Sequence, residues 1–155
     1  MKKTDNTYRV ALFGHRVFDG HRILDKYFFE LLIDLMNAND FVEIYIGRNG
    51  EFDIYAATVV KRVQRLLGKL NNELICILPY WNKDIEYYDE YYDSVRLFEM
   101  HKCHPKGAIT KRNRQMVEMS DLVICYVERE TGGAYSAMKY AERLHKEVIN
   151  LATYN

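Results

Sequence analysis

The chain has 155 residues, of which 48% are hydrophobic and 28% charged, a balance typical of globular proteins and not of disordered or fibrous ones. This length suits one domain, and we expect a single domain over residues 1–155 with its core at about residues 8–151. The 22 Lys and Arg residues equal the 22 Asp and Glu residues, so no excess of positive charge points to nucleic acid or an anionic membrane as partner.

Stretches rich in β-forming residues alternate along the chain with stretches of helical periodicity. We expect strands, in chain order, at residues 8–13, 41–46, 74–78, 94–98, 122–127 and 147–151. We expect helices between them at residues 23–36, 53–67, 80–93, 110–119 and 134–144. This alternation predicts an α/β fold: one Rossmann-like domain with a mostly parallel sheet of five to six strands and helices on both faces.

Other features limit the location of the protein and its chemistry. No apolar run approaches the ~20 residues of a spanning helix, and the first residues lack the apolar core of a signal peptide. We therefore expect a cytoplasmic protein without a membrane partner. The three cysteines, an odd number, agree with a reducing compartment, and Cys76 and Cys125 lie in apolar runs typical of the core. Residues 101–104 (HKCH) lack the second ligand pair of a structural zinc site, so we expect no metal and no required cofactor.

Ligands of parallel α/β proteins bind outside the carboxyl ends of the strands. Two loops expected there contain glycine and lead into helices, at residues 47–50 and 131–133. Glycine lets a ligand approach the backbone, and a helix start offers free N–H groups to a phosphate. Neither loop is a Walker or GxGxxG motif, and each pattern is also typical of a simple turn.

Charged side chains accompany these loops. Arginines, which bind phosphate through two hydrogen bonds, occur in or beside them at Arg16, Arg48, Arg112 and Arg114. Glu51 and Asp53 are candidate catalytic carboxylates that could act as a base or bind ribose hydroxyls. Asp53 fits the cap of the following helix equally well.

The segment 80–92 combines Tyr80, Trp81 and four further tyrosines with several acidic residues. One interpretation is a helix that covers a sheet edge or an interface between subunits, and we accordingly expect a homo-oligomer. The other is a lid that stacks on a nucleobase. The acidic residues would repel a nucleic-acid backbone.

Four segments together resemble one protein family. They are residues 10–16 (VALFGHR), 47–57 (GRNGEFDIYAA), 111–121 (KRNRQMVEMSD) and 131–141 (TGGAYSAMKYA). In this order they resemble the SLOG superfamily, the Rossmann-like group that includes the DprA and Lonely Guy (LOG) proteins, and within it the YpsA-like branch. The resemblance implies a pocket for a nucleotide or a nucleotide derivative. The ligand-binding residues expected on this basis are Gly14, His15, Arg16, Gly47, Gly50, Arg112, Asn113, Gly132, Gly133 and Ser136.

The resemblance to LOG proteins is incomplete at the loop that carries their chemistry. LOG-type relatives cleave the N-glycosidic bond of nucleoside monophosphates with a Gly-Gly-x-Gly-Thr-x-x-Glu loop. Gly132 and Gly133 match its first glycines, and Ser136 replaces the threonine. Lys139 stands in place of the catalytic glutamate, so the residue that carries LOG-type hydrolysis is missing.

Three functions remain open on the sequence. The main hypothesis is a sensor or regulatory module that binds NAD, ADP-ribose or a nucleoside monophosphate and signals through a protein partner or an oligomer. An alternative is an N-glycosidic hydrolase or transferase, with Glu51 or Asp53 as base or nucleophile and Arg112 orienting the phosphate. The third is DNA handling by analogy with DprA. Zero net charge argues against it, so nucleic acid is not an expected partner.

Overall fold

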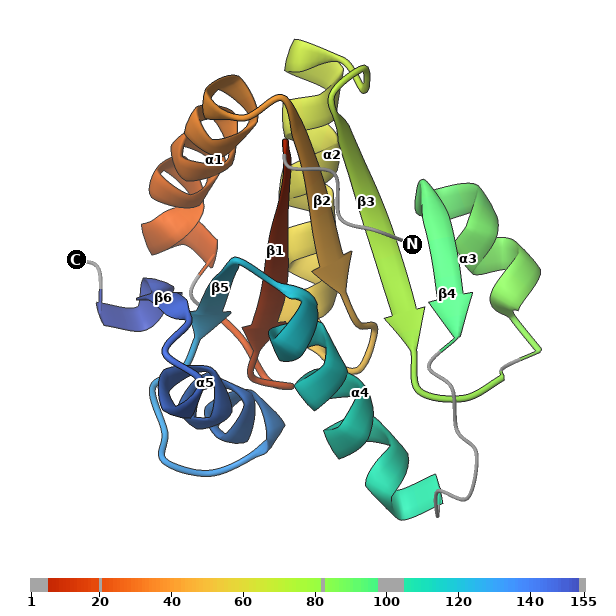
Figure 1. The fold of residues 1–155 in the computed structure, drawn as a ribbon, viewed down its shortest axis with the longest axis vertical. Helices are drawn as coiled ribbons and strands as arrows, with labels where there is room; N and C mark the ends of the chain where they lie inside the picture. The colour runs from red at the N-terminus through yellow and green to blue at the C-terminus, as the bar shows by residue number, and fades with distance from the viewer. Residues whose placement is uncertain (1–5, 20, 82, 98–104, 154–155) are drawn as a thin grey trace.

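The computed structural model describes residues 6–19, 21–81, 83–97 and 105–153, and within them it has an α/β architecture (Figure 1). The strands are β1 (Thr7–Gly14), β2 (Phe41–Ile46), β3 (Asn72–Leu78), β4 (Ser94–Leu97), β5 (Leu122–Tyr126) and β6 (Glu147–Asn150). The helices are α1 (His21–Ala38), α2 (Glu51–Leu67), α3 (Ile85–Tyr91), α4 (Pro105–Met119) and α5 (Gly133–Arg143), followed by a 3-10 turn, Leu151–Thr153. None of the helices described is long and apolar enough to cross a membrane.

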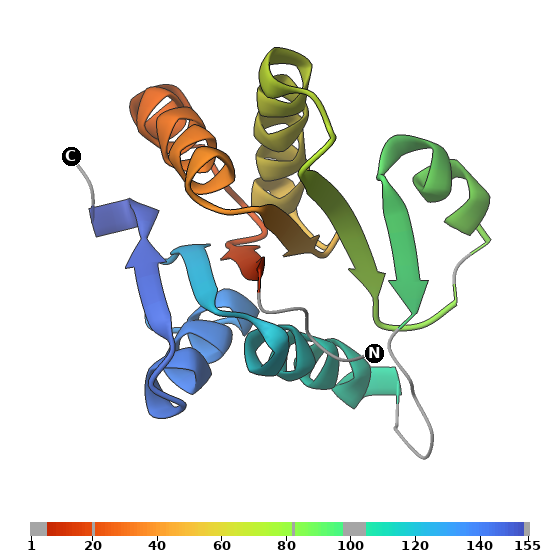
Figure 2. The ribbon, with the colours of Figure 1, turned by 45° about the horizontal axis from the view of Figure 1, so that its top comes forward.

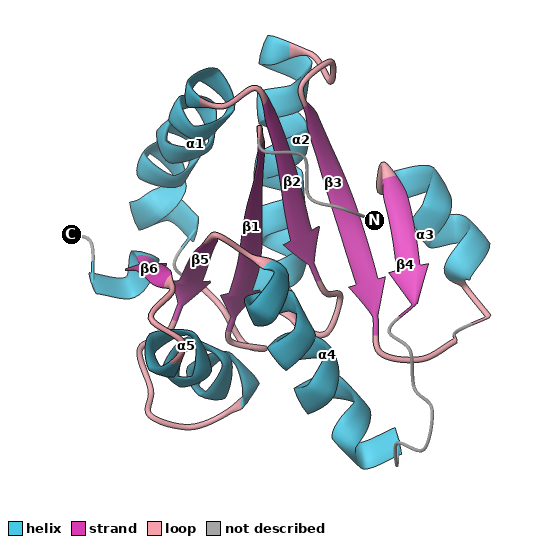
Figure 3. Ribbon diagram, viewed as in Figure 1, coloured by secondary structure: helices cyan, strands magenta, loops and turns pink. Residues whose placement is uncertain are grey.

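All the strands belong to one parallel sheet, in the order β4-β3-β2-β1-β5-β6 (Figure 3). From β1 the chain winds outward through β2 and β3 to β4, and it then returns to place β5 on the other side of β1. The winding therefore reverses between β1 and β5. A crevice outside the carboxyl ends of the two central strands is the usual ligand site of such a sheet.

The helices form a layer on each face of the sheet. Figure 2 shows α1 and α2 on one side and α4 and α5 on the other, with α3 beside the edge strand β4. Buried strand residues alternate between the two layers. Val10 and Leu12 join the core beneath α1 and α2, whereas Ala11 and Phe13 join the core beneath α4 and α5. This two-sided burial explains why the central strands are almost continuously apolar.

The predicted α/β class and parallel sheet are confirmed, but several boundaries differ. The second helix begins at Glu51 and not at Asp53, because the backbone of the β1–α1 loop accepts its first N–H groups: Glu51 N–H donates to the Arg16 carbonyl oxygen at 2.8 Å. The helix expected over 80–93 covers only Ile85–Tyr91. Helix α4 begins earlier than expected, at Pro105.

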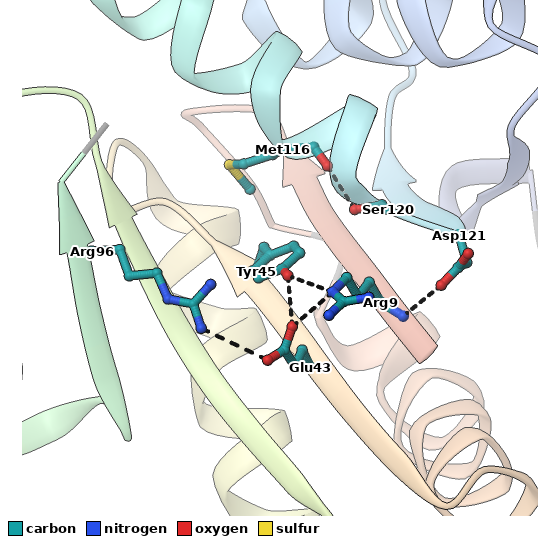
Figure 4. Close-up of polar contacts among 7 residues, drawn as sticks. All are labelled: Arg9, Glu43, Tyr45, Arg96, Met116, Ser120 and Asp121. Carbon is teal, nitrogen blue, oxygen red and sulfur yellow. Dashed lines mark hydrogen bonds and ion pairs between the residues drawn. The ribbon is translucent and has the colours of Figure 1, made fainter. Parts of the chain in front are cut away.

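A polar network lies within the face of the sheet that α4 covers in part (Figure 4). Arg9 Nε donates to Glu43 Oε1 at 2.9 Å and to Tyr45 Oη at 3.2 Å, and the Tyr45 hydroxyl donates to the same Glu43 oxygen at 2.7 Å. Arg96 of the edge strand lies 3.7 Å from the other Glu43 oxygen. Burial and the neighbouring Glu43 carboxylate raise the pKa of Tyr45 to about 12. The carboxylate thus joins three strands across the sheet.

Ser120 and Asp121 end the segment 111–121 that resembles the family, and they have a structural role. They lie at the opposite end of the sheet from the crevice. The Asp121 carboxylate accepts the Arg9 N–H at 2.9 Å, and its own N–H donates to the Arg9 carbonyl oxygen at 2.7 Å. The Ser120 hydroxyl donates to the Met116 carbonyl oxygen at 2.6 Å, as Figure 4 also shows. These bonds fix the connection from α4 to β5.

Gly14 ends β1 directly beneath an aromatic ring. A Cβ added at Gly14 would lie 2.1 Å from Cγ of Phe52, a fully buried residue in the first turn of α2. Real atoms cannot approach so closely, so the absence of a side chain at Gly14 allows α2 to pack against the end of β1.

We predict that Gly14→Ala lowers the free energy of unfolding by about 3 kcal/mol through overpacking against Phe52. Gly133→Ala is the control, because a Cβ there would meet its nearest neighbour at an ordinary 3.6 Å. Denaturant titrations of both variants test this. Equal stability of Gly14→Ala and the wild type would contradict the packing described.

Candidate functional site

A cavity of about 690 Å³ opens outside the carboxyl ends of β1, β2, β3 and β5, where the winding reverses. Small-molecule sites usually fall in this size range. The sequence-predicted residues that line it are Gly14, His15, Arg16, Gly50, Asp53, Arg112, Asn113, Gly132 and Gly133. The lining residues not included in the predicted set are Arg48, Asn49, Tyr80, Ile109, Arg129, Thr131 and Ala134. Most of these occur in the same strand-end loops, which is the signal that could have identified them.

Three predicted site residues lie outside the lining of this cavity. Gly47 packs behind it, where a Cβ would meet the Arg112 guanidinium at 2.6 Å. The Glu51 carboxylate accepts the Phe18 N–H at 2.7 Å and so anchors the β1–α1 loop. Ser136 lines an adjoining cavity between α4 and α5. The structure therefore gives Gly47 and Glu51 packing and anchoring contacts away from the cavity.

Arg112 forms the floor of the cavity and is only 3% exposed. Its Nη1 donates to the Ile77 carbonyl oxygen of β3 at 2.9 Å, and its Nε donates to the Asn113 Oδ1 atom at 2.9 Å. Burial lowers the pKa of Arg112, and the nearby Asp53 carboxylate opposes this effect. Two of the three guanidinium nitrogens are thus occupied by the protein itself.

Asp53 is the carboxylate nearest this arginine in the cavity wall. It lies in the first turn of α2, is 8% exposed, and accepts the Asn49 N–H at 3.0 Å. Burial raises the pKa of Asp53 to about 6, although the Asn49 hydrogen bond and the charge of Arg112 oppose the shift. A buried carboxyl that titrates near neutrality is a common property of functional sites, and it is also found in structural ion pairs.

Asn113 faces the start of α5. Because Arg112 holds its amide oxygen, the amide nitrogen is directed elsewhere: it would lie 3.6 Å from a Cβ placed at Gly133. The first hydrogen bond of α5 runs from the Ser136 N–H to the Gly132 carbonyl oxygen at 3.0 Å, and no side chain caps this helix start. The N–H groups that precede Ser136 therefore have no acceptor within the helix and meet an amide donor across the cavity.

The start of α2 is different, although the sequence predicts a phosphate-binding loop there too. Glu51 N–H and Phe52 N–H donate to the carbonyl oxygens of Arg16 and His15, at 2.8 and 3.4 Å. A Cβ at Gly50 would lie 2.5 Å from the Arg16 Cα atom, so Gly50 permits this contact between loops. The first N–H groups of α2 are thus satisfied by the protein, whereas among the described residues no side chain caps the start of α5.

His15 connects the two central loops as a neutral side chain. Its Nε2 atom accepts the Glu128 N–H at 2.9 Å, which requires the proton of the neutral ring to be on Nδ1. Burial lowers the pKa of His15, and the positive charge of Arg129 acts in the same direction. The imidazole therefore contributes no charge to the cavity at neutral pH.

The cavity carries a clear excess of positive charge. Four arginines line it, namely Arg16, Arg48, Arg112 and Arg129, against the carboxylate of Asp53. Arg16 and Arg129 are exposed, whereas Arg48 is held in place: its Nη1 donates to the Tyr92 hydroxyl at 3.0 Å, and its guanidinium lies 4.7 Å from the Tyr88 ring centroid. The local charge suits an anionic ligand even though the whole chain is neutral.

No group of His, Cys, Asp and Glu residues that could hold a metal ion occurs in the part of the chain that the structure describes. The HKCH sequence at 101–104 lies outside the described residues. Cys76 and Cys125 are buried free thiols, in agreement with their position in apolar runs.

Comparisons with known proteins support the fold. No protein-family model and no curated protein matches the sequence. Among solved structures, DNA processing protein A from Helicobacter pylori is similar at 18% identity with a TM-score of 0.63, over 93% of this chain and 65% of that one. DNA processing protein A (DprA) from Streptococcus pneumoniae is similar at 15% identity with a TM-score of 0.65, over 91% of this chain and 49% of that one. The chain thus shares its fold with these two structures and spans less than two thirds of either protein.

We predict that Asp53→Asn removes a component of the pH dependence of stability. The native pKa of about 6 lies above the usual 3.8, so the folded state binds the proton more tightly than the unfolded state does. The free energy of unfolding of the wild type should therefore fall by about 2 kcal/mol relative to that of Asp53→Asn as pH rises from about 4.5 to about 7.5. Unfolding free energies of both proteins at pH 4.5 and 7.5 test this. Parallel pH profiles would contradict the burial of an ionisable Asp53.

Proposed function

We propose that the cleft binds the phosphate group of a nucleotide at the start of α5. The observation that carries this proposal is the convergence of the uncapped α5 start and the Asn113 amide in one arginine-lined cavity. Helix N-termini with free N–H groups bind phosphate, and a side-chain donor opposite them completes a cradle. Arg129 and Thr131 line the cavity from the loop before α5, where they can add a charge and a hydroxyl.

The nucleotide class is supported by the resemblance of four sequence segments to the SLOG superfamily and by the size of the cavity. All four segments supply cavity residues, namely 14–16, 48–50 with Asp53, 112–113 and 131–134. NAD, ADP-ribose and the nucleoside monophosphates all contain the required phosphate. A regulatory role and an N-glycosidic cleavage through Asp53 are both compatible with such binding.

The second candidate is binding of single-stranded DNA, and two observations favour it. Both similar solved structures are of DNA processing protein A, one of them described for its single-stranded DNA binding mode. A second cavity of about 620 Å³ continues from the cleft between α4 and α5, and both are lined by Ile109, Asn113, Gly132 and Gly133. Its cationic lining residues are Arg114, Lys139 and Arg143. These cations could bind further phosphates of one DNA strand, so the neutral overall charge does not exclude single-stranded DNA as a partner.

We predict that Asn113→Asp strongly weakens phosphate binding without unfolding the protein. Aspartate has the shape of asparagine and keeps an oxygen for Arg112 Nε, but it replaces the amide donor with a negatively charged oxygen facing the α5 start. Binding of nucleoside monophosphates should weaken by at least about tenfold in calorimetric titrations. Asn37→Asp is the control, since Asn37 is exposed in the last turn of α1, at the opposite end of the sheet. Equal affinity of Asn113→Asp and wild type would contradict phosphate binding by the Asn113 amide and the α5 start.

We predict that oligothymidylates distinguish the two candidates. If a strand continues from the cleft into the second cavity, affinity rises with length over the first few nucleotides and falls with salt, with a slope near −0.7 per phosphate neutralised. Arg114→Gln with Arg143→Gln would then reduce the affinity for long oligomers and leave that for a mononucleotide unchanged. Affinity independent of length would contradict the single-strand candidate and leave the nucleotide site intact.

A further inference from the structure

A few of the residues that line the cleft contribute apolar surface to it. Apart from glycines and polar or charged residues, it is built by Tyr80, Ile109 and Ala134. Tyr80 follows the end of β3, and Ile109 lies one helical turn before Arg112 on α4. Tyr80 is 46% exposed and Ile109 is 37% exposed, so two large side chains present apolar surface to solvent within a cavity. Exposed apolar surface of this kind is typical of a binding site.

The tyrosine-rich segment divides into packed and exposed rings. Tyr92 is buried, and its hydroxyl oxygen accepts a hydrogen bond from Arg48 Nη1. The Tyr88 ring lies against the same guanidinium. Tyr91 packs against the core beneath α1 and α2. By contrast, Tyr80 lines the cleft, and the adjacent Trp81 is 67% exposed. The packed rings thus hold the segment and Arg48 in place, whereas Tyr80 and Trp81 have no comparable burial.

Tyr80 also lies close to the charged floor of the cleft, since it interacts electrostatically with Arg112. The same cavity therefore offers an aromatic ring beside the guanidinium floor and a helix start with amide donors at Asn113 and Gly133. A nucleotide has these two chemistries in one molecule: a flat base that stacks on aromatic rings and an anionic phosphate.

We propose that Tyr80 and Ile109 form a nucleobase subsite, in which the ring of Tyr80 stacks on the base of a nucleotide whose phosphate occupies the start of α5. This inference rests on the proposed phosphate site and extends it, because it selects a nucleotide over a sugar phosphate or inorganic phosphate. The acidic residues of the neighbouring α3 segment, among them Glu86, Asp89 and Glu90, are exposed and oppose a nucleic-acid backbone crossing there. The base therefore reaches Tyr80 from the cleft and not across α3.

The test compares ligands with and without a base. The probes are the four ribonucleoside 5′-monophosphates, ribose 5-phosphate and a ten-residue oligothymidylate, titrated into the full chain by calorimetry. Wild-type protein should bind at least one monophosphate about 5- to 150-fold more tightly than ribose 5-phosphate. Tyr80→Ala should remove this advantage and leave the affinity for ribose 5-phosphate unchanged, whereas Tyr80→Phe, which keeps the ring, should retain it.

A matched control and a spectroscopic signal complete the design. Tyr87→Ala removes a tyrosine that is more exposed, at 65%, and lies outside the cavity lining, and it should change no affinity. Trp81 is the single tryptophan of the chain and follows Tyr80 directly, so its fluorescence should change with a bound nucleotide and not with ribose 5-phosphate.

The possible failures are distinguishable. Equal binding of monophosphates and ribose 5-phosphate, with both lost in Asn113→Asp, would overturn the base subsite alone and preserve the phosphate site. Absence of binding by every probe would overturn both proposals. If only the oligothymidylate binds, a loss of affinity in Tyr80→Ala supports a base subsite for one unit of a strand, and unchanged affinity overturns it.

Discussion

The buried guanidinium of Arg112 determines the geometry of the cleft. It reaches from α4 across the ends of two strands, with Nη1 bound to the Ile77 carbonyl oxygen and its planar group packed on Gly47. Its Nε atom fixes the Asn113 amide so that the nitrogen, and not the oxygen, faces α5. A lysine could not make these directed contacts, because it lacks the planar fork of donors.

A buried cation requires compensation, and the cleft supplies it in a specific form. Asp53 lies close enough to interact with Arg112 electrostatically. The Ile77 carbonyl oxygen and the Asn113 amide oxygen accept hydrogen bonds from the guanidinium. Such an arrangement contributes little net stability compared with an apolar core of the same volume, but removing one partner leaves an uncompensated charge. The arrangement is therefore better explained by what it positions, namely the Asn113 donor, than by its contribution to stability.

The sequence could predict the fold because its strands are continuous apolar runs separated by helical periodicity, and β2 was located to the residue. It could also predict that loops after strands meet, which brought Arg16, Asp53, Asn113 and Gly132 to one cavity. It could not distinguish the two glycine-bearing helix starts. Only tertiary contacts reveal that carbonyl oxygens of the β1–α1 loop accept the first N–H groups of α2, whereas no side chain in the described part of the chain caps the start of α5.

The least predictable residues were those whose role depends on a distant partner. Glu51 resembles a catalytic carboxylate in the sequence, but it accepts the Phe18 N–H from a loop 33 positions earlier. Arg129 and Tyr80 carry no motif, and their place in the cavity follows from the strand order alone.

The central claim is that the anionic group of the ligand binds at the start of α5 and not at α2. The most direct measurement is a ¹H–¹⁵N NMR titration of the labelled protein with a nucleoside monophosphate. The account predicts the largest shifts at the backbone amides of Gly133 and Ala134 and at the Asn113 side-chain amide, with little change at Glu51 and Phe52. Dominant shifts at Glu51 and Phe52, or none around the cavity, would contradict it.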